Sequence, residues 1–535
     1  MAQLLDIFAF ISVLFRGMTL AFEALTIGGV VFLAVIARKD VNDSTESRLR
    51  RFVTASAILL AGTQIAFVAA NSAVLMNSAN LTWAQVRGAS FSVAGAFIIA
   101  GAALIGVGAF ARARWRKRVC PAGCILILCG TVMTSHSAAR LEHRGFLAFL
   151  TFVHHAATAA WIGALPYLLW TLREAPGPEN ARSITARFSR MAMISVAVLI
   201  IAGGSMALLY VGSPSALTGT TYGIMLSSKV ILAALLLLLG SLNLRIVRAV
   251  RAGAPVNLLP LRRFGEAEVG IGFTIILAAA SLASTPPAAD VTVGRVTISE
   301  IAERVKPVWP RMRTPALEDL SPPTPLTASV TASVPRSFVP GQLSQPNKPA
   351  DIAWSEYNHH WAGLVVLAAG ILSYLARWVS WARHWPLVFL GLAAFLFLRA
   401  DAENWPLGPH GFWESFQVAE VAQHRMFVVL IVAFGVFEWA VRNARLPANP
   451  SGLVFPLVCA IGGTLLLTHS HSLGNLKEEF LAELSHTPLA ILAVLAGWSR
   501  WLELRLPAPP RPILGQIWPI CFVLIGALLL NYRES

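Results

Sequence analysis

Residues 146–170 read FLAFLTFVHHAATAAWIGALPYLLW, and the interpretation of the whole chain starts from this stretch. It is long and apolar enough for one α-helix to cross the hydrocarbon core of a membrane. Two adjacent histidines, His154 and His155, lie inside it and are followed by Trp161. Polar groups in lipid need partners, so such side chains usually face a bundle interior or a cavity. We therefore interpret the histidine pair as a candidate functional site.

Similar apolar runs recur along the 535-residue chain, which is 56% hydrophobic and only 13% charged. Repeated apolar runs of this length are typical of an all-α polytopic membrane protein. We predict about fourteen membrane-spanning helices. They lie near residues 7–37, 52–75, 89–110, 120–135, 146–172, 189–211, 222–247, 264–284, 358–378, 385–399, 422–441, 453–468, 485–503 and 513–531.

The net charge of +15 comes mainly from lysines and arginines in short loops between these runs. Basic residues gather in alternate loops, as at residues 38–51, 112–118 and 248–263. Because cytoplasmic loops of membrane proteins are enriched in lysine and arginine, these loops are predicted to be cytoplasmic. The same alternation places both chain termini on the extracytoplasmic side.

Residues 285–357 interrupt the pattern of apolar runs. They are rich in proline and polar residues, as in SPPTP at 321–325. This composition predicts a long extracytoplasmic linker, with one short amphipathic helix near Ile298–Val305. The linker divides the chain into an eight-span membrane domain of residues 1–284 and a six-span membrane domain of residues 358–535.

Eleven of the twelve histidines fall on the predicted outer side of the membrane. Carboxylates accompany several of them, and imidazole with carboxylate is a ligand set that suits copper or zinc. The pattern predicts a metal or redox cofactor on that side, although each single histidine also has an interfacial or structural interpretation. The candidate metal ligands are His136, His143, His154, His155, His359, His360, His424, His469, His471 and His486.

Two charged residues lie inside other predicted spans, Glu23 in the first and Lys229 in the seventh. Each is interpreted either as a structural contact between helices or as part of a transport path. The chain lacks a nucleotide-binding loop, a CxxCH haem-attachment motif and a hydrolase nucleophile motif. We therefore expect a transport protein and not an enzyme.

Three stretches resemble the CopD/PcoD family of copper-resistance membrane proteins. HHAATAAWIGALPYLLW, residues 154–170, resembles the family's helix with a histidine followed by Trp-x-Gly-Gly-Leu, although the second glycine is Ala164 here. Residues 219–244 resemble its Thr-x-Tyr-Gly…Lys…Asn helix, and residues 266–288 resemble its closing helix. The matching positions of these two helices are Tyr222, Gly223, Lys229, Asn243 and Glu268.

The resemblance covers roughly residues 1–290, with a multi-span C-terminal extension. It implies a protein of the bacterial inner membrane that handles copper, as Cu(I) or Cu(II), and imports it from the periplasm. A periplasmic CopC-type copper carrier is the implied partner. Two other functions stay open. One is a b-type haem electron-transfer protein, in which His154 or His155 pairs with His359 or His424 as axial ligands. The other is delivery of copper to a membrane oxidase.

The predicted topology can be tested at the linker. A cysteine introduced by Ser333→Cys is expected to react with an impermeant thiol reagent in intact cells whose outer envelope is permeabilised, because residues 285–357 are predicted to lie outside. Labelling that requires lysis of the inner membrane would contradict this topology.

Overall fold

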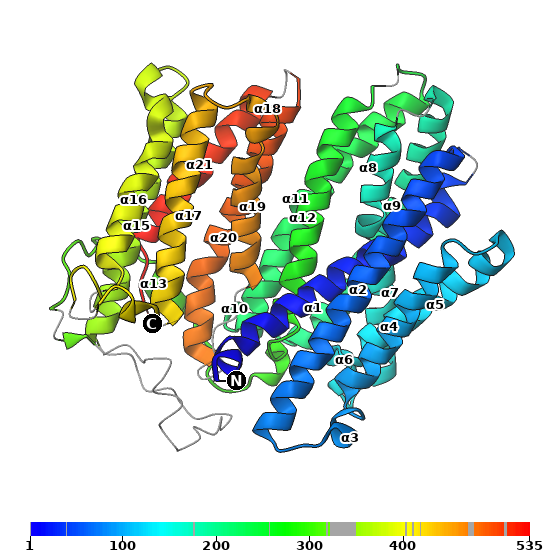
Figure 1. Ribbon diagram of the computed structural model, residues 1–535, viewed down its shortest axis with the longest axis horizontal. Helices are drawn as coiled ribbons and strands as arrows, with labels where there is room; N and C mark the ends of the chain where they lie inside the picture. The colour runs from blue at the N-terminus through cyan, green and yellow to red at the C-terminus, as the bar shows by residue number, and fades with distance from the viewer. Residues whose placement is uncertain are drawn as a thin grey trace.

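Only helices and loops, without a β-strand, occur in the part of the chain that the computed structural model describes (Figure 1). The described residues are 2–38, 40–174, 177–255, 257–316, 319–320, 349–401, 404–408, 411–417, 419–468, 476–507 and 511–534. The all-helical class predicted from the apolar runs is therefore confirmed for these residues.

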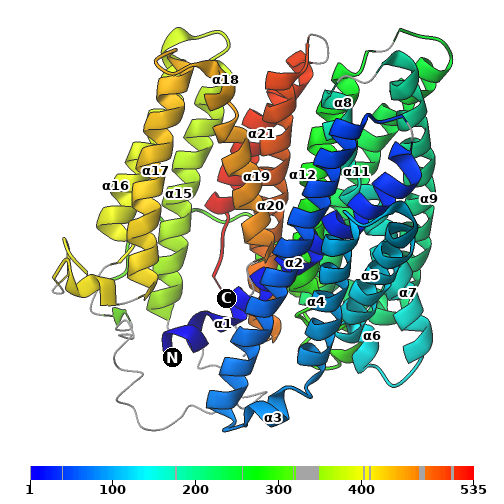
Figure 2. The ribbon, with the colours of Figure 1, turned by 45° about the vertical axis from the view of Figure 1, so that its right-hand side comes forward.

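The helices form two groups that lie side by side (Figures 1 and 2). The long helices of the first group are α1 (Ala2–Val31), α2 (Asp43–Ser78), α4 (Ser90–Gly108), α5 (Ala113–Met133), α7 (Arg144–Thr158), α8 (Leu165–Arg173), α9 (Pro178–Val211), α11 (Thr221–Arg251) and α12 (Leu259–Leu282). The long helices of the second group are α15 (Pro349–Leu375), α16 (Val388–Arg399), α17 (Ala419–Arg442), α19 (Val454–Thr468), α20 (Leu476–Arg505) and α21 (Arg511–Leu530).

Short elements connect the long helices. Two of them are π-helical turns, η1 (Phe32–Ala37) and η2 (Ala159–Gly163), which continue α1 and α7. The short α-helices are α3 (Trp83–Val86), α6 (His136–Ala139), α10 (Pro214–Thr218), α13 (Ile298–Val305) and α18 (Ala448–Ser451). The 3₁₀ turns are η3 (Ala288–Asp290), η5 (Ser380–Leu387) and η6 (Glu414–Gln417).

Eleven helices of the described residues are long and apolar enough to cross a membrane, so the chain is a multi-pass membrane protein. Each of the other three predicted spans also coincides with a helix. These are α5, which begins with a basic stretch, α15, which begins with polar residues, and α19, which has 15 residues. The number of crossings, fourteen, therefore stays a prediction.

The positions of the chain termini distinguish the two ends of the helix bundle. Both chain termini lie at the same end as α3, α6 and α13, which we call the terminal end (Figure 1). The opposite end, which we call the basic end, carries arginines in the last turns of α8, α11, α17 and α20. The position of both termini at one end agrees with an even number of membrane crossings. The assignment of the terminal end to the periplasm stays a prediction from charge.

The linker is described in part. Its predicted amphipathic helix is confirmed as α13, Ile298–Val305, which begins with a capping box between Thr297 and Glu300. The helix α15 begins at Pro349, nine residues before the predicted boundary at residue 358. The proline-rich SPPTP stretch lies outside the described residues.

In the first group, α1 crosses η2 so closely that the two backbones touch. A Cβ atom built on Gly163 would lie 1.8 Å from the carbonyl oxygen of Ala24, and one built on Gly28 would lie 2.2 Å from the carbonyl carbon of Gly163. Small residues allow such a crossing because no side chain separates the helices. The crossing brings Glu23 of α1 to His155 of α7.

The contact surface between the two groups, which we call the seam, joins α11 and α12 to α19 and α20. The indole of Trp498 occupies the space that a side chain on Gly270 would fill, 1.6 Å from the position of its Cβ. Further along the seam, the buried hydroxyl groups of Thr274 and Thr464 are hydrogen-bonded at 2.8 Å. Both apolar packing and polar contacts therefore hold the groups together.

The crossing of α1 and η2 predicts the effect of one added methyl group. Gly163→Ala is expected to lower the free energy of unfolding by about 1–3 kcal/mol, because the new Cβ meets the backbone of α1. The measurement is the unfolding midpoint in mixed micelles. Gly204→Ala is the matched control, because a Cβ at Gly204 meets nothing within 4 Å. Equal stability of the two variants would contradict the crossing.

Candidate functional site

The candidate site lies where α1, α5 and α7 meet in the first group. The carboxylate of Glu23 is buried, with 2% of the residue exposed. Its Oε1 lies 3.2 Å from Nδ1 of His155, and its Oε2 accepts a hydrogen bond of 2.7 Å from the hydroxyl group of Thr131. Three helices thus contribute one polar side chain each to an otherwise apolar region.

This arrangement orients the imidazole of His155. A carboxylate only accepts hydrogen bonds, so Nδ1 of His155 carries the hydrogen and donates it to Glu23. In the neutral ring, Nε2 then keeps a lone pair with which it can bind a metal ion. Histidine ligands commonly donate their other ring nitrogen to a carboxylate in this way, which fixes the ring and raises its basicity. Glu23 and His155 therefore have the geometry of an oriented ligand and its supporting group.

The neighbouring His154 faces other helices. Its ring lies against Gly203 of α9, with Cε1 at 3.3 Å from the position of a Cβ there. Its Nδ1 is buried and has no hydrogen-bond partner among the described residues. Lys229 of α11 acts on it electrostatically. The two imidazole centroids are 6.3 Å apart, as expected for adjacent residues that point about 100° apart on a helix.

Trp161 lies one to two turns further along and lines a cavity of about 270 Å³ between α8, α9, α11 and α12. Most of its wall is apolar. Its polar lining includes the pair formed by Asn243 and Glu268, in which Nδ2 of Asn243 donates to Oε1 of Glu268 at 2.6 Å. Glu268 is buried, with 3% exposed. The three residues that the sequence resemblance placed in separate helices thus lie around one cavity.

Two predicted ligands, His136 and His143, lie at the terminal end before α7. His136 packs in α6 against the rings of Tyr210 and Tyr222, at centroid distances of 6.0 and 6.3 Å. Burial lowers the pKa of His136, so its imidazole is neutral at physiological pH. His143 is exposed and precedes the first turn of α7 with a left-handed φ of 54°. Neither residue contacts the Glu23–His155 pair.

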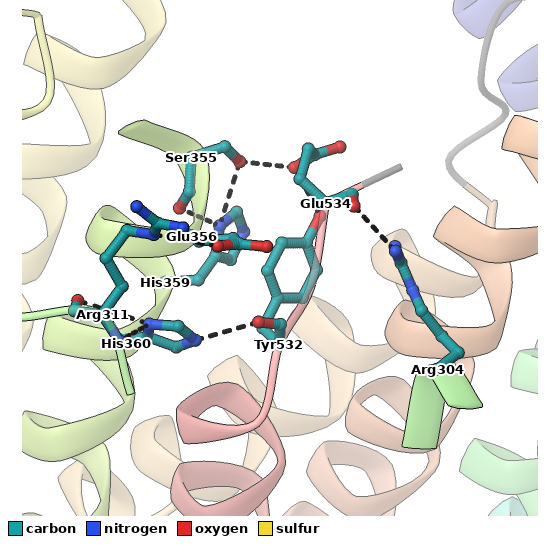
Figure 3. A network of polar contacts seen from close by, with 8 residues as sticks. All are labelled: Arg304, Arg311, Ser355, Glu356, His359, His360, Tyr532 and Glu534. Carbon is teal, nitrogen blue, oxygen red and sulfur yellow. Dashed lines mark hydrogen bonds and ion pairs between the residues drawn. The ribbon is translucent and has the colours of Figure 1, made fainter. Parts of the chain in front are cut away.

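His359 and His360 of α15 belong to a polar network that joins the linker, α15 and the C-terminal tail (Figure 3). Nδ1 of His360 accepts the backbone N–H of Arg311 at 2.7 Å, and its Nε2 donates to the carbonyl oxygen of Tyr532 at 2.9 Å. Both ring nitrogens are therefore used. His359 donates through Nδ1 to the carbonyl oxygen of Ser355 at 2.8 Å and stacks on the ring of Tyr532.

The remaining predicted ligands lie in the second group or beyond the described residues. His424 of α17 forms a second imidazole–carboxylate pair, with Nδ1 at 2.8 Å from Oδ1 of Asp401. His486 of α20 lies near Tyr532, with ring centroids 6.2 Å apart. His469 and His471 lie outside the described residues. The described residues contain no group of three or more histidine, cysteine or acidic side chains that could hold a metal ion.

Sequence reasoning singled out Glu23, His154, His155, Trp161 and Lys229 but did not connect them. The structure brings Glu23 to His155, and Lys229 into electrostatic range of His154. The reasoning missed Thr131, because a threonine in a membrane helix is too common to signal a site.

Comparison with known proteins identifies part of the first group. Residues 182–282 match the family described as copper resistance protein D (CopD). This copper resistance protein D domain covers 101 residues, about a fifth of the 535-residue chain, and runs from α9 to α12. It contains Lys229 and the Asn243–Glu268 pair, and the resemblance found in the sequence is confirmed there. No curated protein and no solved structure matches the chain.

The Glu23–His155 contact predicts an energetic coupling. In a double-mutant cycle, Glu23→Ala and His155→Ala are expected to show an interaction energy of about 1–3 kcal/mol in unfolding, because either single change leaves a buried polar group without its partner. The control pairs Glu23→Ala with His143→Ala, whose effects should add. Additive effects in both cycles would show that the contact does not contribute to stability.

Proposed function

We propose, on the basis of the copper resistance protein D domain at residues 182–282, that the chain transports copper ions across the bacterial inner membrane. The direction we infer is uptake from the periplasm, with a role in copper homeostasis or resistance. The observation that carries the proposal is the carboxylate-oriented imidazole of His155 inside a membrane helix. It lies next to His154, which packs against the α9 helix of that domain.

The chemistry of the pair suits a copper ion as cargo. A neutral imidazole can bind copper without a permanent charge in the membrane, and imidazole is a common copper ligand. The carboxylate of Glu23 compensates the positive charge of a bound ion, which lowers the cost of bringing that ion out of water. Nδ1 of His154 is buried without a partner among the residues that the structure describes, so this ring can supply a second nitrogen after a rotation.

Copper would reach this site from the terminal end of the bundle. His136 and His143 lie on that side, before α7, and His424 with Asp401 lies at the start of α17. We propose that these residues, together with His469, His471 and His486, collect copper from the periplasm or from a CopC-type carrier. His359 and His360 have a structural role in this scheme, because hydrogen bonds to the backbone occupy three of their four ring nitrogens.

The proposal predicts a separation between transport and folding. Glu23→Gln keeps the size of the side chain but removes its charge, and it is expected to weaken copper binding by about 10–100-fold, as changes in supporting groups of metal ligands do. His154→Gln and His155→Gln together are expected to abolish copper accumulation. The measurements are cellular copper by mass spectrometry and copper retained by purified protein, both normalised to membrane abundance.

The matched control is Glu142→Gln, which changes an exposed side chain on the same side and should leave copper binding within about two-fold of the unchanged protein. If the double variant inserts normally and binds and accumulates copper as before, the site assignment is wrong. If purified protein shows a Soret band that the double variant loses, electron transfer through b-type haem replaces copper transport as the function. Normal copper uptake with a loss of oxidase metallation would point to copper delivery.

A further inference from the structure

Two acidic residues are buried where the seam meets the terminal end. Glu479 and Glu483 lie one turn apart on α20, and 3% and 2% of these residues are exposed. Glu483 accepts a hydrogen bond from the hydroxyl group of Thr487 at 3.3 Å. Glu479 lines a small pocket against the start of α11. The pair therefore lies between the two groups of helices and outside the copper site proposed above.

The pocket beside Glu479 has the size and the polar lining that a water molecule requires. Its volume of about 10 Å³ is close to the space that one water molecule needs. Oε2 of Glu479 and Oγ1 of Thr221 are both buried and lack a hydrogen-bond partner among the described residues. Both side chains line this pocket, one from each group of helices. Two such side chains that line one water-sized space indicate a hydrated site.

No basic side chain of the described residues binds either carboxylate. On α20 itself, Lys477 pairs with Glu300 of α13, and His486 lies near Tyr532. From α11, the titratable group at the pocket is Tyr222. In the segment that follows η3, Arg295 binds the backbone carbonyl oxygens of Ala288 and Val291.

Two further acidic residues of the described part of this region are bound elsewhere or belong to the same helix. Glu534 of the C-terminal tail binds Ser355 and Arg304 (Figure 3), and Glu478 follows Lys477 on α20. Two carboxylates this close repel one another when both are ionised. Burial without a cation makes the doubly ionised state still more costly. The positive end of the helix dipole at the start of α11 favours one negative charge nearby, but not two.

We propose that Glu479 and Glu483 form a proton-binding site at the seam, in which the pair holds one proton, with a water molecule in the pocket as the route to the terminal end. A carboxylic acid beside a carboxylate satisfies the pair without a basic partner. Because the two oxygen-bearing walls belong to different groups of helices, a change of protonation alters the contact between the groups.

Such a site gives copper transport a source of driving force, and this use of the proton rests on the proposed function. A proton taken up from the periplasmic side would change the seam, and with it the position of α11 relative to α20. The helix α11 carries Lys229, which acts on His154 of the copper site. The seam and the candidate copper site are therefore connected through one helix.

The proton site can be tested without copper. Dicyclohexylcarbodiimide, an apolar reagent, reacts with protonated carboxyl groups in apolar surroundings and leaves a stable adduct that peptide mass spectrometry locates. In the full-length protein in chelator-treated micelles, we expect adducts on Glu479 or Glu483 that decrease from about pH 5 to about pH 9. Glu503, which pairs with Arg500 at 2.6 Å, and Glu266, which pairs with Arg505 at 2.9 Å, are internal controls and should stay unlabelled.

A variant tests whether the two carboxylates share the proton. In Glu479→Gln, half-maximal labelling of Glu483 is expected to move by roughly one pH unit toward lower pH, because the repelling charge is gone. Glu503→Gln is the matched control and should leave that pH unchanged. Absent labelling of both residues, labelling that is constant over this pH range, or an unchanged half-labelling pH in Glu479→Gln would each overturn the site.

Copper uptake into cells at two external pH values separates the two proposals. With a functional proton site, uptake should rise at the lower pH in the unchanged protein, and Glu483→Gln should remove this dependence while copper binding to His155 persists. If Glu479 and Glu483 are labelled as expected but no variant takes up copper, the transport function is refuted and the proton site is still supported. If the labelling is as expected but copper uptake depends neither on pH nor on Glu483→Gln, the proposed coupling of proton binding to copper uptake is wrong.

Discussion

The contact between Gly28 of α1 and Gly163 of η2 is the constraint on which the first group of helices depends. Neither residue has a side chain, so the two backbones approach closely enough for α1 to lie along α7. The π-helical turn at η2 contributes, because it shifts the residues of α8 relative to α7 and brings Gly163 to the crossing. A larger residue at either position would move Glu23 away from His155, since both lie within about two turns of the crossing.

Three buried carboxylates in this protein are compensated by polar partners from another element of the chain. Glu23 is bound by His155 and Thr131, Glu268 by Asn243, and Asp401 by His424. Each pair costs less to bury than its members would alone, and each joins two elements of the bundle. Glu479 and Glu483 depart from this rule, because the side chain of one carries the same charge as that of the other. This departure is what distinguishes a site that binds a proton from a contact that only stabilises the bundle.

The seam links the two groups by contacts of three kinds along its length. Near the basic end, the indole of Trp501 donates to Glu266 at 2.9 Å, and in the middle Trp498 fills the space beside Gly270. At the terminal end, the contact consists of Glu479 and the start of α11 around a water-sized pocket. The packed middle is the rigid part, since tightly interlocked side chains have one arrangement. The hydrated terminal end is the part whose contacts depend on protonation.

The sequence by itself determined that the chain is helical and that it spans a membrane many times, whereas the placement of its histidines on one side stays a prediction. These properties follow from composition and from the length of the apolar runs, which must match the thickness of the membrane. The helix α13 was also predictable, from its amphipathic period, and the position of Lys229, Asn243 and Glu268 in a copper resistance protein D domain was predictable from short motifs.

Only the tertiary structure decided which polar groups meet. The pairing of Glu23 with His155 joins residues 132 positions apart, and the use of both ring nitrogens of His360 depends on the C-terminal tail. Such contacts depend on how helices cross and rotate against one another, and the sequence of a single helix does not specify which residues of other helices it will contact.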